Sequence, residues 1–354
     1  MLAAQFVGKP VFDVSEVERP ECPPGGLLVR VQACAICGTD LKIMQCQDVK
    51  MERGKATAMD IPRITGHEFS GVVEEVGEGV SGFAAGSRVV VAPTVPCMNC
   101  PMCKKSYYEM CDAVQVIGYH RDGGFAQFAR VDEDVLAAGC VVEVPDSIDL
   151  GVAALTEPFS CAINCMELTP VKNGDTVLVM GAGPLGCFMV DLAHHKGAGQ
   201  VILADISEVQ LKKASVAEPS TTIDLSREDI YERIQDLTDG LAADLVITAC
   251  PAPKAQQDAL QVVAKRGSVN FFGGLPRDRS VVPLDTNLIH YKECIIVGTH
   301  GSAPKHIAEA VELQASGAIN LGKYVDRRFP LSEINEALEI ARGHGRMKIL
   351  VEPN

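Results

Sequence analysis

The sequence predicts an α/β protein in which a β-rich part precedes a doubly wound parallel sheet, and three observations support this prediction. Residues 1–155 contain short β-type runs such as LLVRVQACAI and GSRVVVAP, broken by Gly and Pro. Many short strands between turn signals indicate a barrel-like or sandwich-like unit. From about residue 155 onward, apolar strands alternate with helical segments, which is typical of a parallel sheet. A glycine-rich turn follows the first of these strands.

The elements of the second part follow one another in order. TEPFSCAINCMEL is predicted to be a helix, DTVLVM a strand, GAGPLGCFMVDLAHHKG a turn and helix, QVILADI a strand and SEVQLKKASV a helix. ADLVITAC, GSVNFFGG and CIIVGTH are later apolar runs that end in small residues. SAPKHIAEAVELQASG and LSEINEALEIARGHG are predicted to be helical, and the final KILVEP is a strand able to rejoin the first part.

Composition excludes several classes of function. The chain has 354 residues, of which 47% are hydrophobic, so it can bury a large core. Its net charge of −14 disfavours nucleic acid and anionic membrane as partners, since both need basic patches. No secretory signal and no apolar run of about 20 residues is visible. Fourteen cysteines without such a signal indicate a reducing compartment, and we expect the cytoplasm.

The most specific motif is a cysteine ladder in the stretch CMNCPMCKKSYYEMC, formed by Cys97, Cys100, Cys103 and Cys111. Four thiolates within fifteen residues can surround one tetrahedral Zn²⁺. Buried or disulfide-bonded cysteines are one alternative reading, and an iron–sulfur cluster is another. A closed four-cysteine site has no open coordination position, so the ladder predicts stability and not catalysis.

A dinucleotide site is predicted from G-x-G-x-x-G at residues 181–186, which follows the strand VLVM and opens a helix. Gly181 permits the tight turn, Gly183 lets the backbone approach a pyrophosphate, and Gly186 lets helix and strand pack closely. Asp205 ends the next strand, where an acid accepts ribose hydroxyls and repels a 2′-phosphate, so NAD is preferred over NADP. The remaining candidate cofactor contacts are Pro184 and Leu185 in the turn and Gly273, Gly298 and Thr299 near the ends of later apolar runs.

A second set of residues gains meaning only in combination. Cys37 lies in ICGTDLK, His67 in TGHEFSG and Glu157 in LTEPFS. Alone, a buried His is usually a core residue and a lone Cys a small hydrophobe. With the ladder, VMGAGPLG, ADIS and GRMKILV, however, the whole sequence resembles the zinc-dependent medium-chain dehydrogenase/reductase family. It looks most like the polyol (sorbitol-type), threonine and sugar-alcohol-phosphate dehydrogenases, because Glu157 stands where the alcohol dehydrogenase branch carries Cys.

The resemblance implies a GroES-like catalytic domain over residues 1–157 and 299–354 and an NAD-binding Rossmann domain over residues 158–298. It also implies one structural and one catalytic zinc per chain, the latter held by Cys37, His67 and either Glu68 or Glu157. Family members differ in which Glu contacts the metal. Such a ligand set leaves the fourth position open for water or substrate.

The resemblance further implies alcohol oxidation, in which zinc lowers the pKa of the substrate hydroxyl and hydride passes to the nicotinamide ring. Thr39 matches the relay hydroxyl of the family, and Glu68 belongs to the catalytic residues as well as to the candidate ligands. The family usually carries His five residues after the ligand Cys, where this chain has Lys42. Lys42 is therefore either a tuned relay base or a solvated surface lysine.

The expected substrate is a polyol, sugar alcohol or related secondary alcohol, which is oxidised to a ketone. Sorbitol-type members carry an Arg–Tyr pair where this chain has His300 and Ser302, which puts D-sorbitol itself in doubt. A threonine-type or aminocyclitol-type substrate is the alternative. Lys50, Arg53 and Lys55, in the long loop between Cys37 and His67, are the candidate cations for a substrate phosphate.

Other classes fit the sequence less well. Zinc-free reductases of the same superfamily lack both the ladder and the Cys–His–Glu set. A non-catalytic zinc-ribbon or nucleotide-sensing protein is disfavoured by the negative charge and by the intact ligand set. The resemblance implies a homodimer or homotetramer, with edge strands pairing around Cys294–Gly298.

Overall fold

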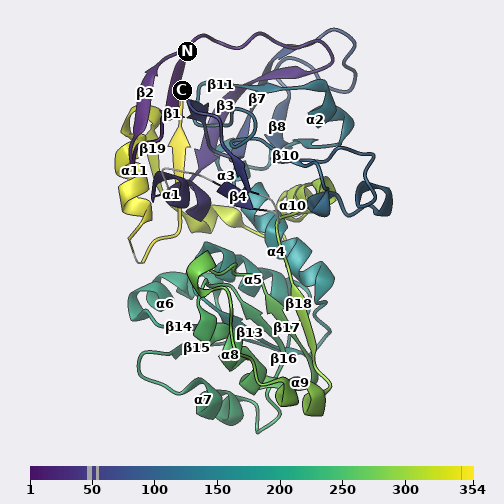
Figure 1. Ribbon diagram of the computed structural model, residues 1–354, viewed down its shortest axis with the longest axis vertical. Coiled ribbons are helices and arrows are strands. Elements are labelled where there is room, and N and C mark those ends of the chain that lie inside the picture. The colour runs from purple at the N-terminus through teal and green to yellow at the C-terminus, as the bar shows by residue number, and fades with distance from the viewer. Residues whose placement is uncertain (46–49, 53–55, 344) are drawn as a thin grey trace. The chain divides into compact units, whose positions relative to one another are not determined.

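A computed structural model describes the backbone of residues 1–354 except 46–49, 53–55 and 344. Side chains of residues 45–58 are also not described. The predictions made for Lys50, Arg53 and Lys55 therefore lie outside the described side chains. The chain forms two compact units, shown in Figure 1. The first unit is Met1–Ser160, Gly301–Gly343 and Lys348–Asn354, and the second is Cys161–His300 and His344–Met347.

The first unit is β-rich, as the sequence predicts, and its main sheet is mixed. The strand order is β12 (Val141–Glu143), β8 (Arg88–Val91), β7 (Glu68–Val76), β3 (Leu27–Ala35), β20 (Lys348–Glu352) and β19 (Val325–Pro330), and β11 (Phe128–Val131) also pairs with β3. The C-terminal strand β20 runs antiparallel to β3, so the predicted return of KILVEP to the first part is confirmed. The alternating buried residues of β3, such as Val29 and Val31, contribute to its hydrophobic core.

Smaller sheets and short helices complete this unit. The further strands are β1 (Leu2–Phe6), β2 (Phe12–Glu16) and β6 (Arg63–Ile64) in one sheet, β4 (Lys50–Glu52) with β5 (Ala56–Ala58), and β9 (Thr94–Val95) with β10 (Gln115–Val116). The helices are α1 (Gly38–Gln45), η1 (Cys103–Lys105), η2 (Tyr108–Met110), α2 (Glu133–Ala137), α3 (Leu150–Ala153), α10 (Pro304–Ala315), η5 (Leu321–Tyr324), η6 (Leu331–Glu333) and α11 (Ile334–Ala341). Helix α4 (Thr156–Leu168) contains the boundary between the two units.

The second unit is a parallel sheet with helices between its strands. The order is β15 (Thr221–Asp224), β14 (Gln200–Asp205), β13 (Thr176–Met180), β16 (Ala243–Thr248), β17 (Val263–Phe271) and β18 (Ile295–Gly298). Taking β13 as first, this is the order 3-2-1-4-5-6 of dinucleotide-binding sheets. The connecting helices are α5 (Pro184–His195), α6 (Glu208–Ala214), η3 (Ser215–Ala217), α7 (Ile230–Leu237), α8 (Pro253–Val262), η4 (Arg277–Arg279) and α9 (Thr286–Lys292).

The central strands β13, β14 and β16 are mostly apolar, as is typical of a parallel sheet covered on both faces. Leu178, Ile202 and Val246 are fully buried in its core.

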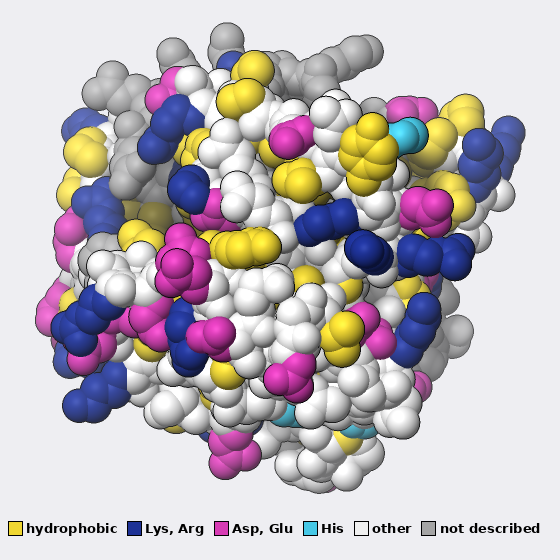
Figure 2. Space-filling model, turned by 90° about the horizontal axis from the view of Figure 1, so that it is seen from below, with side chains coloured by type: hydrophobic (Ala, Val, Ile, Leu, Met, Phe, Trp, Pro, Cys, Tyr) yellow, Lys and Arg dark blue, Asp and Glu magenta, His cyan; other side chains and the backbone are white. Residues whose placement is uncertain are grey.

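At the surface, acidic and basic side chains lie interspersed on the face shown in Figure 2. No helix within the described part of the chain combines the length and apolar composition needed to cross a membrane.

Candidate active site and metal centres

The register of three neighbouring strands brings together a group of polar residues that are distant in sequence. Ala35, at the end of β3, pairs with Glu68 at the start of β7, so Cys37 and His67 emerge at the same place. Leu350 of β20 also pairs with Ala35, and the Ile36 amide donates to the Ile349 carbonyl at 2.9 Å. The predicted Cys37–His67 pair is therefore a consequence of antiparallel pairing, which spacing along the chain does not reveal.

Cys37, His67 and Glu68 form a compact donor set, in which one donor atom from each residue lies within 4.8 Å of the others. His67 and Glu68 are buried, at 7% and 1% exposure. A thiol, an imidazole and a carboxylate are the donor types that zinc takes in catalytic sites with an open position. The donor set therefore fits the zinc that the sequence predicts there.

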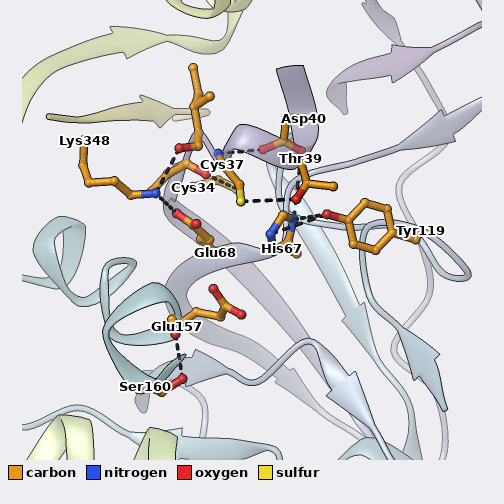
Figure 3. Close-up of polar contacts among 12 residues, drawn as sticks. Cys34, Cys37, Thr39, Asp40, His67, Glu68, Tyr119, Glu157, Ser160 and Lys348 are labelled. Atoms are coloured by element: carbon orange, nitrogen blue, oxygen red, sulfur yellow. Dashed lines mark hydrogen bonds and ion pairs between the residues drawn. The ribbon is translucent and has the colours of Figure 1, made fainter. Parts of the chain in front are cut away.

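Lys348 is the cationic partner of Glu68 (Figure 3). Its Nζ donates to Glu68 Oε2 at 2.5 Å and to the Ile36 carbonyl at 3.0 Å, and the residue is 5% exposed. Burial alone would lower the pKa of Lys348, but the charges of Glu68 and Cys37 outweigh that effect and raise it. Lys348 therefore stays charged and holds one oxygen of Glu68 in place.

Three further groups surround His67 and Cys37 (Figure 3). Asp40, fully buried in the first turn of α1, accepts the Cys37 amide at 2.8 Å. Thr39 Oγ1 lies 3.6 Å from Cys37 Sγ. The Tyr119 hydroxyl lies 2.9 Å from His67 Nδ1. Thr39, predicted to be the relay hydroxyl, thus lies beside the predicted ligand thiol.

The buried charges around His67 shift its pKa strongly. Burial would lower the pKa of His67, but its interactions with Cys37 and Asp40 raise it to about 10. Burial raises the pKa of Asp40 to about 6. Without metal, His67 is therefore a cation among acidic groups, and metal binding there must displace a proton.

Glu157, in the first turn of α4, is half-buried and does not belong to the group of mutually close donor atoms formed by Cys37, His67 and Glu68. Burial raises its pKa to about 7, with the charge of Glu68 adding to the effect. The Ser160 hydroxyl donates to the Glu157 carbonyl at 2.6 Å and lies 2.7 Å from the Ser302 hydroxyl. Ser302 thus supports the helix that carries Glu157.

The cysteine ladder forms one cluster between β9 and β10. All four Sγ atoms lie within 4.8 Å of one another. The Sγ–Sγ distances are 3.5 Å for Cys100–Cys103, 3.8 Å for Cys100–Cys111 and 4.0 Å for Cys97–Cys103. Zn–S bonds of ~2.3 Å in a tetrahedron require sulfurs about 3.8 Å apart, so the cluster fits zinc.

Backbone amides favour thiolates in this cluster. The Cys103 amide lies 3.4 Å from Cys100 Sγ, and the Cys97 amide lies 3.2 Å from Cys111 Sγ. Hydrogen bonding from the Cys103 amide is the main cause that lowers the pKa of Cys100 to about 6. Burial raises the pKa of Cys103 to about 12. Zinc stabilises the thiolate form of all four sulfurs, so it would relieve this mismatch.

The three glycines of the turn have different steric surroundings, each compatible with the role predicted for it. Gly181 has a φ of +115°, which disfavours any side chain. A Cβ at Gly183 would meet nothing within 4 Å, so the approach to the backbone is open there. A Cβ at Gly186 would lie 1.9 Å from the Gly181 carbonyl oxygen. Pro184 occupies the start of α5, where it needs no hydrogen-bond partner.

Asp205 is placed beside this turn at the end of β14. Its carboxylate accepts the amides of Ala182 at 2.8 Å and Ser207 at 2.9 Å. Thr299 Oγ1 lies 3.0 Å from Asn270 Oδ1 and the Gly273 amide donates to the Thr248 carbonyl at 2.7 Å. These residues follow the carboxyl ends of parallel strands, the edge where dinucleotides bind.

Two further residues considered from the sequence, Lys42 and His300, are not members of the compact donor set. Lys42 is exposed on α1, and His300 is exposed after β18. Sequence reasoning missed Asp40, Tyr119 and Lys348. Asp40 follows Thr39 within the ligand motif, and Lys348 is a cation at the start of an apolar strand, so both had a signal. Tyr119 had none.

Comparison with known proteins identifies the family. The Alcohol dehydrogenase GroES-like domain family matches residues 23–146, and the Zinc-binding dehydrogenase family matches residues 184–316. L-threonine 3-dehydrogenase of Pyrococcus abyssi is 32% identical over 97% of this chain and 96% of its own length. This chain belongs to the zinc-dependent medium-chain dehydrogenase/reductase family. Its GroES-like and Rossmann fold class is thereby confirmed.

Two further relatives are similar over nearly the whole chain. Sorbitol dehydrogenase of Bacillus subtilis is 31% identical over 95% of this chain and 92% of its own length. A zinc-binding dehydrogenase of Sinorhizobium meliloti 1021, solved with NADP bound, superposes with a TM-score of 0.89 at 30% identity. That superposition covers 99% of each chain. The relatives thus include dehydrogenases of polyols and of threonine.

Proposed function

We propose that this protein oxidises a secondary alcohol of a polyol, sugar alcohol or related compound to a ketone, with NAD as hydride acceptor. The observation that carries the proposal is the compact donor set of Cys37, His67 and Glu68, whose donor atoms lie within 4.8 Å of one another. Zinc bound there supplies a Lewis acid that favours the deprotonated form of a substrate hydroxyl.

The residues around the donor set have separate roles in this proposal. Cys37 and His67 hold the metal with one carboxylate, for which Glu68 is favoured because Glu157 lies outside the compact donor set. Lys348 fixes the second oxygen of Glu68. The Thr39 hydroxyl, 3.6 Å from Cys37 Sγ, relays the proton of the substrate hydroxyl: it accepts that proton and releases its own toward solvent. Lys42 is exposed, which supports the solvated reading over a relay role.

The preference for NAD is supported by Asp205. Its carboxylate is fixed by two backbone amides at the end of β14, where a 2′-phosphate would meet its negative charge. We assign the metal chemistry to residues 1–157 and 299–354 and cofactor binding to residues 158–298. Asp205→Ser should reduce the preference for NAD over NADP, and an unchanged ratio of kcat/KM values would contradict this assignment.

L-Threonine is the second candidate substrate, favoured by the 32% identity to L-threonine 3-dehydrogenase of Pyrococcus abyssi. Its reaction is also the oxidation of a secondary alcohol to a ketone, so the same donor set serves both. The deciding experiment is a panel of polyols, their phosphates, aminocyclitols and L-threonine, in which the absorbance of the reduced cofactor is followed. A substrate oxidised only as its phosphate would indicate a cationic subsite.

Metal analysis completes the test. We expect two zinc ions per chain in the native protein. Cys37→Ser should keep only the zinc at the cysteine ladder and have no activity, and Cys100→Ser should keep only the zinc at the Cys37 site. Cys37→Ser with unchanged zinc content, or native protein with zinc at the ladder alone, would contradict the proposed active site.

We further propose a homodimer or homotetramer in a reducing compartment, the cytoplasm. Strand β18 is the edge of the parallel sheet, and Ile295 on it and Tyr291 before it are 58% and 76% exposed. An exposed apolar edge strand is stabilised by pairing with a second copy. Ile295→Lys should lower the mass measured by light scattering, whereas an unchanged mass would place the contact elsewhere.

A further inference from the structure

Gln210 is a buried polar side chain of the second unit to which the proposed function gives no role. It lies in α6, the helix that follows Asp205, and is 8% exposed. Its Nε2 group donates to the Ala182 carbonyl at 2.9 Å and to the Arg346 carbonyl at 3.3 Å. Its Oε1 accepts the Gly345 amide at 2.8 Å. One side chain thus joins the glycine-rich turn to a segment near the C-terminus, 135 positions beyond Gln210.

The partners of Gln210 decide which end of its amide faces the turn. A backbone N–H only donates and a backbone carbonyl only accepts, so Oε1 must face Gly345 and Nε2 must face the two carbonyls. The Nε2 group has two hydrogens and two carbonyl partners, and Oε1 has one N–H partner. A side chain that only accepts hydrogen bonds, or only fills space, therefore cannot replace Gln210.

The backbone of Ala182 is held through both of its polar groups. Its amide donates to Asp205 Oδ2 at 2.8 Å, and its carbonyl accepts from Gln210. Ala182 is completely buried, so water cannot replace a donor that is lost at this carbonyl. The Cys187 thiol, 3.6 Å from the same oxygen, is only a weak donor. Gln210 therefore supplies the strong hydrogen bond to the Ala182 carbonyl.

The segment on the other side of Gln210 is closely fitted to α6. His344–Met347 belong to the second unit, although the residues before and after them belong to the first. Gly345 has a φ of +71°, and a Cβ there would lie 2.6 Å from Val209 Cγ1. Both the backbone conformation and the close approach to α6 therefore favour glycine at this position. The Gly345 amide is thus held beside Gln210 by packing as well as by its hydrogen bond.

Ala182 stands between Gly181, which makes the tight turn, and Gly183, where the backbone is open to the pyrophosphate. We propose that Gln210 is a positioning residue of the cofactor site, which holds this turn in the conformation that receives the pyrophosphate and fixes it to the segment at Gly345. Gln210 acts through the Ala182 carbonyl and not through a contact with the cofactor. The inference deepens the proposed function and rests on it only in that the turn binds a dinucleotide.

Gln210→Met keeps an unbranched side chain of similar length but removes the amide, so it isolates the hydrogen bonds. The turn then spends less time in the binding conformation, and the apparent affinity falls by the same factor. We expect calorimetry to give a Kd for ADP-ribose at least about fivefold higher than in the native protein. KM for NAD should rise similarly, while kcat at saturating NAD and KM for the alcohol stay native. Adenosine, which lacks the phosphates, should lose less affinity than ADP-ribose.

Gln314→Met is the matched control, because Gln314 on α10 is 9% exposed and its Nε2 also makes two hydrogen bonds, to the Thr156 hydroxyl and the Ala310 carbonyl. It carries the same chemical change in the first unit and should leave the Kd for ADP-ribose at the native value. A native Kd in Gln210→Met would overturn the proposal. Equal weakening in both variants would also overturn it, since it would reflect a general loss of stability. Equal losses for adenosine and ADP-ribose would overturn it too, because they would indicate that Gln210 contacts the ribose.

A measurement on the unaltered sequence keeps the proposal testable if Gln210→Met does not fold. In ¹⁵N-glycine-labelled protein, saturating ADP-ribose should slow hydrogen exchange at the Gly345 amide, because a turn ordered by its ligand also orders Gln210. An unchanged exchange rate at Gly345 would overturn the proposal. If the native protein binds neither NAD nor ADP-ribose, the cofactor assignment fails and this inference fails with it. If it binds both and Gln210→Met binds them equally well, only the role of Gln210 fails.

Discussion

Replacing Lys348 with Met removes the cation that faces Glu68 while keeping an unbranched side chain in the strand. At 2.5 Å and an effective dielectric constant of about 20, the Nζ–Oε2 attraction is about 7 kcal/mol. Part of this attraction offsets the free energy needed to bury the ammonium group, a cost that Met does not carry. Breaking one side of a buried pair typically costs about 3–5 kcal/mol, because the other charge is left unpaired. We therefore expect the free energy of unfolding of metal-free Lys348→Met to be about 3–5 kcal/mol lower than that of the metal-free native protein.

The presence of zinc should reduce this cost, because a divalent cation beside Glu68 replaces the missing positive charge. The comparison needs Lys348→Met in the native background and in Cys37→Ser, where the Cys37 site holds no metal. The chain contains no Trp, so unfolding in guanidinium is followed by circular dichroism. Lys42→Met is the control, since an exposed lysine should change stability by no more than about 0.5 kcal/mol. A loss below about 1 kcal/mol for Lys348→Met in the Cys37→Ser background would refute the reasoning.

Three other outcomes are expected. Cys100→Ser should bind one zinc fewer and have a lower Tm, because the remaining ladder thiolates then lack a shared cation. A native Tm with one zinc lost would show that the ladder contributes no stability. Gly186→Ala should destabilise the second unit by about 2 kcal/mol or more, because its Cβ would lie 1.9 Å from the Gly181 carbonyl oxygen. Gly183→Ala, whose Cβ would meet nothing within 4 Å, should retain the native Tm but bind NAD more weakly. In the folded protein the Glu157 carboxyl has a pKa of about 7, above its ordinary value of 4.5. The zinc-depleted native protein should therefore lose stability as the pH rises from 4.5 to about 7, and Glu157→Gln should not show this loss. Parallel Tm–pH curves for the two proteins would contradict that last expectation.

Motifs that depend on local spacing could be predicted from the sequence. The four ladder cysteines lie within fifteen residues, so a few turns of backbone suffice to bring their sulfurs together. The glycine-rich turn is equally local: the steric roles of Gly181, Gly183 and Gly186 follow from one strand, one turn and one helix. In both cases the chemistry follows from residues that remain neighbours in any fold the chain adopts.

The active site could be predicted only through resemblance to a family, and then only in part. Cys37 and His67 meet because Ala35 pairs with Glu68, a register that depends on the whole sheet. Lys348 reaches Glu68 across 280 positions of sequence, and Tyr119 reaches His67 across 52. No periodicity or spacing links such residues, so they had to be found in three dimensions.

This division between local and distant contacts has a consequence for function. The ladder is the most specific motif in the sequence, yet as a set of four thiolates it leaves no coordination position for a substrate. The incomplete set of Cys37, His67 and one carboxylate leaves such a position, and Lys348 holds one oxygen of the Glu68 carboxylate. Relatives that share the ligands can therefore differ in the residues around them. We expect the choice among polyols, sugar alcohols and threonine to lie in those surrounding side chains, because the metal ligands treat every secondary alcohol alike.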